Sequence, residues 1–152
     1  MVEEMFENSS LIRGALLRYR DLPEVSTLRA NGQEAETEAN AWILAQYLQY
    51  AGAEKVAVVT GKIPGNSGDA THTWVEADGI TADISAKRFP ESHTLIVISA
   101  QSVFHSLIDS PSRTKVTPVN LKKHHEYVEA YKTLLRKHPA LKSPAGSQMK
   151  EG

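Results

Sequence analysis

The hydrophobic positions in the first part of the chain follow helical spacing. Residues 9–20 open with two serines suited to an N-cap, and the apolar residues after them fall on one face of a helix. These apolar residues are Leu11, Ile12, Leu16 and Tyr19. Pro23 cannot continue the helix and restricts the residue before it. The pattern therefore predicts one amphipathic helix that ends just before Pro23.

A second helix is predicted over residues 36–51, after a turn at Asn31-Gly32. One face carries Ala41, Leu44, Ala45 and Leu48, and Trp42, Ile43 and Tyr47 widen it. Such a wide apolar face predicts a helix that is largely buried. Gly52 stands where a C-terminal capping glycine is expected.

The spacing then changes to that of strands. Residues 55–63 are mostly apolar and β-branched, 71–77 alternate, and 80–85 and 94–100 are predicted as further strands. Asp78-Gly79 between two of these strands is a strong signal for a two-residue hairpin turn. A flexible loop is expected over 64–70.

The last part of the chain predicts a return to helix. Residues 101–108 indicate a short helix or turn, 111–118 a connector, and 119–138 a final helix that Pro139 stops. Two helices, a run of strands and a helix predict an α+β domain with an antiparallel sheet.

Composition narrows the function classes without selecting one. The 152 residues include 41% hydrophobic positions, a formal net charge of −1 and no cysteine. This composition predicts one folded domain, argues against a general nucleic-acid or membrane surface, and removes thiolate metal sites and thiol nucleophiles. The acidic start lacks the apolar segment of a signal peptide, and no apolar run is long enough to span a bilayer. We therefore expect a soluble, cytoplasmic protein without a bound cofactor or metal.

His72 and Asp83 are the residues that suggest chemistry. They flank the predicted hairpin turn, and cross-strand neighbours lie about 5 Å apart. Because His72 is further from the turn than Asp83, the two side chains meet only if the strands are offset or bent. A carboxylate on one imidazole nitrogen would leave the other to act as a base. Alternatively, the pair braces the hairpin.

This region resembles the transglutaminase-like branch of the papain-like cysteine protease superfamily. The resemblance covers roughly residues 30–108. It rests on a buried helix with an alanine and a terminal glycine, an apolar strand, a His-x-Trp-Val-Glu strand, a hairpin and an aspartate. The matching positions are Thr37, Ala41, Gly52, residues 56–61, His72, Trp74, Glu76, Asp78, Gly79 and Asp83. It implies a papain-like fold with N-terminal helices on an antiparallel sheet.

The resemblance implies a site of three residues in which Thr37 occupies the position of the family's nucleophilic cysteine. In an active site, Thr37 at the start of its helix would attack, His72 would be the general base, and Asp83 would orient the imidazole. Gln33 could supply an oxyanion donor. Trp74 is expected in the core or in the wall of the substrate pocket.

Threonine changes what the site is expected to do. A threonine hydroxyl is far less acidic than a thiol, and internal Thr37 has no free α-amino group to act as its base. The first hypothesis is a degenerate acyltransferase or peptidase that binds a peptide or protein. The second is an active amide hydrolase or acyltransferase, or a cysteine enzyme whose nucleophile has been replaced by Thr37.

The third hypothesis is an interaction protein that uses the fold as a scaffold. Its contacts would come from the basic C-terminal helix, whose cations are Lys122, Lys123, Lys132, Arg136 and Lys137. His105, within the short segment 101–108, could cap a helix or line the cleft, and a structural role is favoured. The near-neutral total charge argues against nucleic acid as a partner.

The expected organisation has four parts. An N-terminal helical segment (1–29) precedes the transglutaminase-like core (30–110). A C-terminal helix (111–139) then packs on the core, and a disordered tail (140–152) follows.

Overall fold

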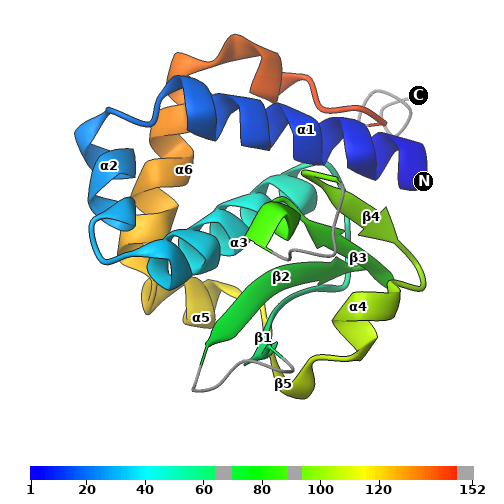
Figure 1. Cartoon of the computed structure of the whole chain (residues 1–152). Coiled ribbons are helices and arrows are strands. Elements are labelled where there is room, and N and C mark those ends of the chain that lie inside the picture. Colours follow the sequence, from blue (N-terminus) through cyan, green and yellow to red (C-terminus); the bar gives the residue numbers. More distant parts are fainter. Residues whose placement is uncertain (64–69, 89–93, 147–152) are drawn as a thin grey trace.

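The computed structural model describes residues 1–63, 70–88 and 94–146 as an α+β domain with one five-stranded sheet (Figure 1). The elements in chain order are α1 (Val2–Arg18), α2 (Pro23–Arg29), α3 (Gln33–Tyr50), β1 (Val56–Lys62), β2 (Thr71–Ala77), β3 (Ile80–Asp83), η1 (Ala86–Arg88), β4 (Val97–Ser99), α4 (Val103–Ser106), β5 (Asp109–Lys115), α5 (Pro118–Lys122), α6 (His125–Lys137) and η2 (Pro139–Lys142).

The strands lie in the order β4-β3-β2-β1-β5, and every neighbouring pair is antiparallel. The predicted α+β class with an antiparallel sheet is confirmed. The turn at Asp78-Gly79 is also confirmed, since Ala77 pairs with Ile80 and both turn residues have positive φ, 51° and 81°. Positive φ at both central positions defines the type I′ hairpin turn.

Side-chain alternation divides the core between the two faces of the sheet. Val58 and Val75, which are register partners, pack into the main core with α1, α3 and α6. Their chain neighbours Val59 and Trp74 face the other way and form a smaller cluster with Ile108. Helices therefore cover both faces, the large ones on the first face and α4 on the second.

The helix α3 is buried on most of its circumference, as predicted. It begins at Gln33, three residues before the predicted start, because Gly32 adopts φ 103° and serves as the N-cap. It ends at Tyr50, and Gly52 at φ 112° follows as the expected left-handed glycine.

The N-terminal helix is longer than predicted. It starts at Val2, so Ser9 does not cap it and is instead fully buried within it. Pro23 opens the separate helix α2 instead of only ending α1, which fits the tolerance of proline at the first helical position.

The predicted connector 111–118 is wrong, because residues 109–115 form edge strand β5 against β1. The single predicted helix 119–138 is also wrong, because the chain leaves the helical conformation at His124 and splits it into α5 and α6. His124 packs on Trp42 there, with ring centroids 4.2 Å apart.

The predicted disorder of the tail is wrong for residues 140–146. Leu141 is fully buried, and Asn8 on α1 holds the backbone of Ala145 through two hydrogen bonds of 2.7 and 3.2 Å. The rest of the tail, and nearly all of the loop expected over 64–70, lie outside the described residues. No helix among those that the structure describes is long and apolar enough to cross a membrane.

Candidate functional site

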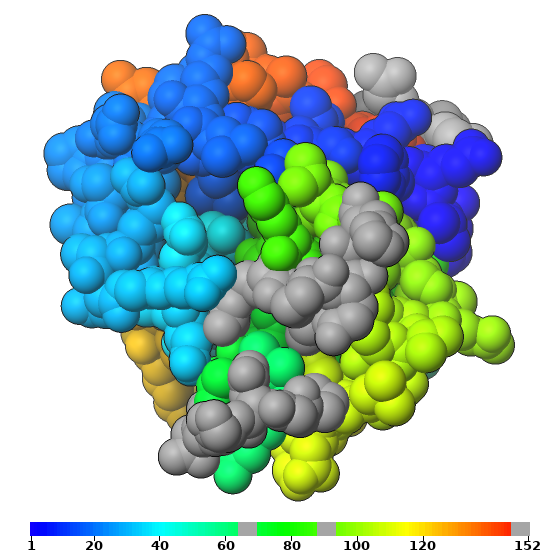
Figure 2. Space-filling model, viewed as in Figure 1, coloured from blue at the N-terminus to red at the C-terminus, as the bar shows by residue number. Residues whose placement is uncertain are grey.

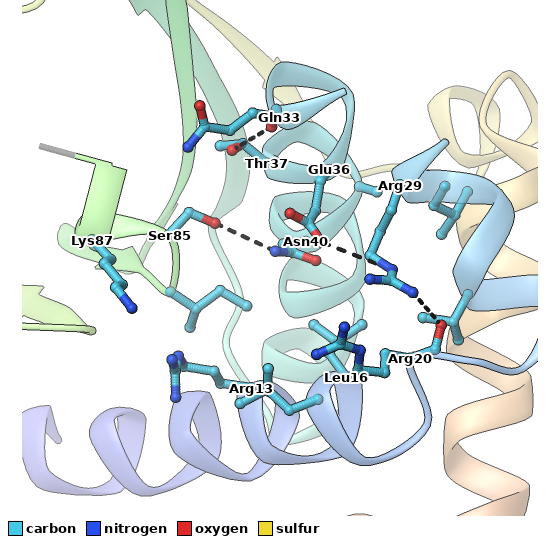
Figure 3. Close-up of a pocket in the computed structure, with 15 residues that line it drawn as sticks. Arg13, Leu16, Arg20, Arg29, Gln33, Glu36, Thr37, Asn40, Ser85 and Lys87 are labelled. Atoms are coloured by element: carbon cyan, nitrogen blue, oxygen red, sulfur yellow. Dashed lines mark hydrogen bonds and ion pairs between the residues drawn. The ribbon is translucent and has the colours of Figure 1, made fainter. Parts of the chain in front are cut away.

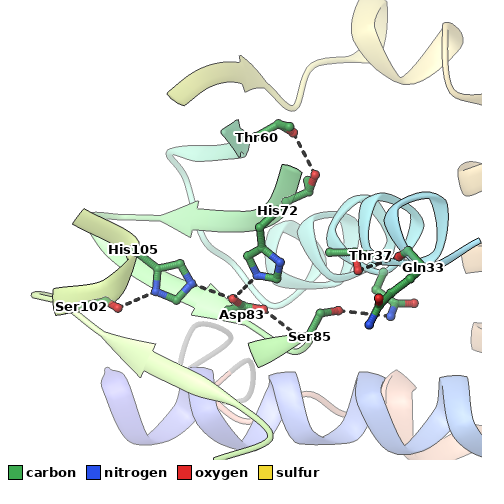
Figure 4. A network of polar contacts seen from close by, with 10 residues as sticks. Gln33, Thr37, Thr60, His72, Asp83, Ser85, Ser102 and His105 are labelled. Atoms are coloured by element: carbon green, nitrogen blue, oxygen red, sulfur yellow. Dashed lines mark hydrogen bonds and ion pairs between the residues drawn. The ribbon is translucent and has the colours of Figure 1, made fainter. Parts of the chain in front are cut away.

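Two histidines share one carboxylate oxygen in the buried part of the sheet (Figure 4). Nε2 of His72 and Nε2 of His105 each lie 2.6 Å from Oδ2 of Asp83. The three side chains are 0%, 3% and 1% exposed, respectively. A carboxylate accepts hydrogen bonds and cannot donate them when ionised, so both nitrogens carry the proton in these contacts.

The hydrogen bonds around Asp83 continue on both sides. Its second oxygen, Oδ1, accepts the backbone N–H of Ser85 at 2.7 Å. Nδ1 of His105 pairs with the hydroxyl of Ser102, which donates to it when Nε2 carries the ring proton. Since Nε2 of His72 donates to Asp83, Nδ1 is the basic nitrogen of neutral His72.

The contacts with the two histidines lower the pKa of Asp83. Burial alone would raise this pKa, because it disfavours the charged form. The hydrogen bonds from His105 and His72 act in the opposite direction, and together with the electrostatic attraction between the carboxylate and the two rings they hold the pKa below its ordinary value of 3.8. Asp83 is therefore a carboxylate at neutral pH.

The strand register explains how His72 reaches Asp83. Val75 pairs with Ala82, so continuing the pairing by one residue sets Asp83 opposite Trp74. His72 lies two residues before Trp74 and shares its face of the sheet. The contact is thus a diagonal cross-strand pair, which long side chains can span without a bulge.

The structure brings two of the three predicted catalytic residues together and leaves Thr37 outside their hydrogen bonds. Thr37 is in the second turn of α3, so its predicted place at the helix start is wrong. Its hydroxyl donates to the carbonyl of Gln33 at 2.9 Å. This is the i−4 bond that threonine makes inside helices.

Two contacts nevertheless tie the turn that carries Thr37 to the His72–Asp83 region. The hydroxyl of Thr71, next to His72, donates to Glu34 at 2.8 Å, and Asn40 donates to Ser85 at 3.4 Å. Glu34 and Asn40 both lie three residues from Thr37 along α3. The helix is therefore fixed against the ends of both strands that carry the pair.

A pocket of about 370 Å³ opens beside this turn (Figure 3). Thr37 and Gln33 line it together with Ser85, so the predicted oxyanion donor Gln33 borders a concave surface. Figure 2 shows the surfaces that meet here: the blue of α1, the light blue and cyan of α2 and α3, and the green of the segment after β3.

The other predicted binding residue, Trp74, is buried in the second cluster of the sheet. It is 2% exposed, and its ring lies 6.0 Å from that of His72 and 5.0 Å from that of His105. It therefore packs beside both imidazoles. Glu76, two residues on, forms an ion pair with Arg113 at 2.8 Å.

The His72–Asp83–His105 cluster also has the chemistry of a metal ligand set. One atom from each residue lies within 4.8 Å of the other two, and two imidazoles with a carboxylate suit zinc or iron. In this structure the Nε2 atoms of both histidines are hydrogen-bonded to Oδ2 of Asp83.

His105 is the site residue that the sequence did not reveal. It follows Asp83 by 22 positions and comes from the short helix α4, so no strand or helix spacing relates the two. The one available signal was that His105 lies within residues 30–108, the range of the predicted family resemblance, and this did not identify a partner for it.

The basic C-terminal region presents its cations to solvent. Lys122, Lys123, Lys132, Arg136 and Lys137 are all exposed. Lys132 lies 3.9 Å from Glu129 on the same helix. Exposed pairs of this kind contribute little to stability.

Comparisons with known proteins do not assign a family. No family model matches the chain, and no curated protein matches it. A crystal structure of a genomics target aligns with 96% of this chain and 82% of that one, at 14% sequence identity and a TM-score of 0.38. A similarity this weak does not establish a common fold or function.

Proposed function

We propose that this chain is a papain-like, transglutaminase-like domain with a degenerate acyl-transfer site that binds a peptide or protein segment. One observation carries the proposal. The His72–Asp83 pair is formed and buried, and the helix turn of Thr37 is fixed beside it, yet the Thr37 hydroxyl bonds to the helix backbone. The pocket beside Thr37 supplies the binding surface.

The surroundings of Thr37 explain why binding is favoured over catalysis. Its hydroxyl proton is held by the carbonyl of Gln33, not by an imidazole nitrogen. The N–H of Glu36 already donates to Gly32 at 3.0 Å, so Thr37 lies beyond the unpaired N–H groups at the helix start. An oxyanion formed here would lack the donor at the nucleophile's own backbone.

A second candidate function is an active amide hydrolase or acyltransferase. The buried His72–Asp83–His105 cluster favours it, because Asp83 has a lowered pKa and carboxylates perturbed by specific partners concentrate at catalytic sites. The Thr37 hydroxyl would rotate away from Gln33 and attack the acyl carbon, forming an ester while its proton passes to His72. His72 would return the proton to the leaving amine, and water would release the acid. Turnover of a peptide amide that disappears in Thr37→Ala would establish this function.

The test of the degenerate site is the Thr37→Cys variant. The chain has no native cysteine, so a thiol-reactive acyl probe has no other thiol to label. We expect labelling at least about tenfold faster than in Glu36→Cys, a neighbouring position that also lines the pocket, because an imidazole promotes the thiolate.

Adding His72→Ala to Thr37→Cys should remove that advantage. Equal labelling of the variants at positions 36 and 37, unaffected by His72→Ala in folded protein, would mean that Thr37 is not the position of a nucleophile.

A further inference from the structure

We infer that the pocket beside Thr37 selects a peptide segment that combines acidic and apolar side chains. The inference rests on the proposed function in taking this pocket as the surface that receives the peptide. It adds the chemical class of the ligand.

The lining of the pocket is strongly cationic, whereas the chain as a whole carries a net charge of −1. Arg13, Arg20, Arg29 and Lys87 border it, and Glu36 is the one carboxylate among the described lining residues. These cations come from α1, the α1–α2 connection, α2 and η1, so the fold gathers them from separate parts of the sequence. Like charges collected on a concave wall raise the local concentration of anions.

Most of this charge is not neutralised within the described part of the molecule. Arg29 lies 3.8 Å from Asp21 and 4.0 Å from Glu36. Arg13, Arg20 and Lys87 have no carboxylate within 4.0 Å among the residues that the structure describes. Guanidinium groups bind carboxylates through paired N–H donors, so an acidic side chain is a matching ligand for this wall.

Six further lining residues are apolar, which argues against a purely ionic ligand. The apolar side chains are Leu16, Leu17, Val25, Leu28, Ala39 and Ile84. A phosphate ion would leave them unused, and the described residues of the lining include no aromatic ring on which a nucleic-acid base could stack. A volume of about 370 Å³ is within the range of ligand pockets and accommodates a few side chains.

The pocket also brings such a segment past the position of the family nucleophile. Figure 3 shows Thr37, Asn40 and Ser85 on one side of the pocket and Arg13, Arg20 and Arg29 on the other, with Lys87 beside Ser85. A peptide whose acidic residue contacts the cations therefore has its backbone beside Thr37.

Isothermal titration with three acetylated, amidated hexapeptides tests the inference. The first is Gly-Glu-Leu-Glu-Leu-Gly, the second replaces Glu by Gln, and the third replaces Leu by Ser. We expect measurable binding of the first peptide only, and weaker binding when sodium chloride is raised from about 50 to about 500 mM.

Two double variants locate the binding. Arg13→Gln with Lys87→Gln should weaken binding of the first peptide about tenfold, which is what two partly exposed charge pairs contribute. Lys122→Gln with Lys132→Gln makes the same change of charge on α5 and α6 and should leave the affinity for the first peptide unaltered. Circular dichroism confirms that both variants fold.

Each other outcome overturns the inference in a distinct way. Equal binding of the Gln peptide, unaffected by Arg13→Gln with Lys87→Gln, would leave peptide binding intact and remove the acidic preference. Full displacement by millimolar inorganic phosphate would show a simple anion site, and tighter binding of a short oligothymidine would show a nucleic-acid site. The protein could also bind none of the peptides while its Thr37→Cys variant still labels in a way that depends on His72. That result would overturn this inference but would leave the proposed degenerate acyl-transfer site standing.

Discussion

Asp83 is the residue on which the buried cluster depends, since it accepts hydrogen bonds from His72, His105 and the backbone of Ser85. Its pKa is lower in the folded protein than its ordinary value of 3.8. A depressed folded pKa gives stability that is present above the unfolded pKa and is lost as pH falls through the folded pKa. We therefore expect Asp83 to contribute to acid unfolding below about pH 4.

The Asp83→Asn variant isolates that contribution. Asparagine has one acceptor oxygen, so one of the three donors is left unpaired and the variant should lose about 1–3 kcal/mol at neutral pH. Its unfolding free energy should then change less than that of the wild type between about pH 5 and about pH 2. Urea titrations measure both, with exposed Asp109→Asn as the control. Parallel pH profiles for the wild type and Asp83→Asn would contradict a depressed pKa.

His105 is expected to act as a positioning residue, through Asp83. In the Thr37→Cys background, His105→Ala should slow labelling several-fold and move its pH profile, because Asp83 loses one of the donors that hold it. His105→Gln retains an N–H donor at a similar reach and should recover part of the rate. A purely structural role would lower thermal stability in both variants without moving the pH profile.

At the residue scale, the sequence predicted contacts that depend on one hairpin and missed those that depend on tertiary packing. The Asp78-Gly79 turn fixes the register that lets His72 reach Asp83. His105 reaches the same oxygen through α4, which no local pattern places on that face. Thr37 bonds to the carbonyl of Gln33 because α3 begins at Gln33, after the N-cap Gly32, and not at residue 36 as predicted.

At the element scale, edge strand β5 shows where periodicity fails. All seven of its residues are exposed, and Pro111 stands within it. Apolar and polar residues normally alternate along a strand because one of its faces is buried. Neither face of β5 is buried, so its sequence shows no such alternation. It exists because β1 offers a free edge, with Val58 opposite Thr114.

The segment after Pro139 is a structural element and not a tail. Leu141 is fully buried in the main core, so Leu141→Ala should lower the unfolding free energy by about 2–5 kcal/mol. The adjacent Lys142 is exposed, and Lys142→Ala should change the unfolding free energy by less than about 0.5 kcal/mol. Equal midpoints of the two variants in urea would mean that this segment does not pack on the core.

At the scale of the whole molecule, the two tryptophans report on the two faces of the sheet. Trp42 lies in the main core with α3, and Trp74 lies in the smaller cluster beside His72 and His105. Both faces are carried by the same strands, since Val58 and Val59 alternate along β1. Losing one cluster therefore removes the support of the other, and the domain should unfold in one step.

Single-tryptophan variants test this coupling. Trp42→Phe leaves fluorescence from the cluster beside the candidate site, and Trp74→Phe leaves fluorescence from the main core. Within each variant, the fluorescence midpoint should coincide with the midpoint from far-ultraviolet circular dichroism, although each substitution lowers stability by its own amount. If Trp74 fluorescence changed at clearly lower urea than the helix signal, the face holding His72, Asp83 and His105 would open separately, and the site would be a local unit mounted on a stable helical core.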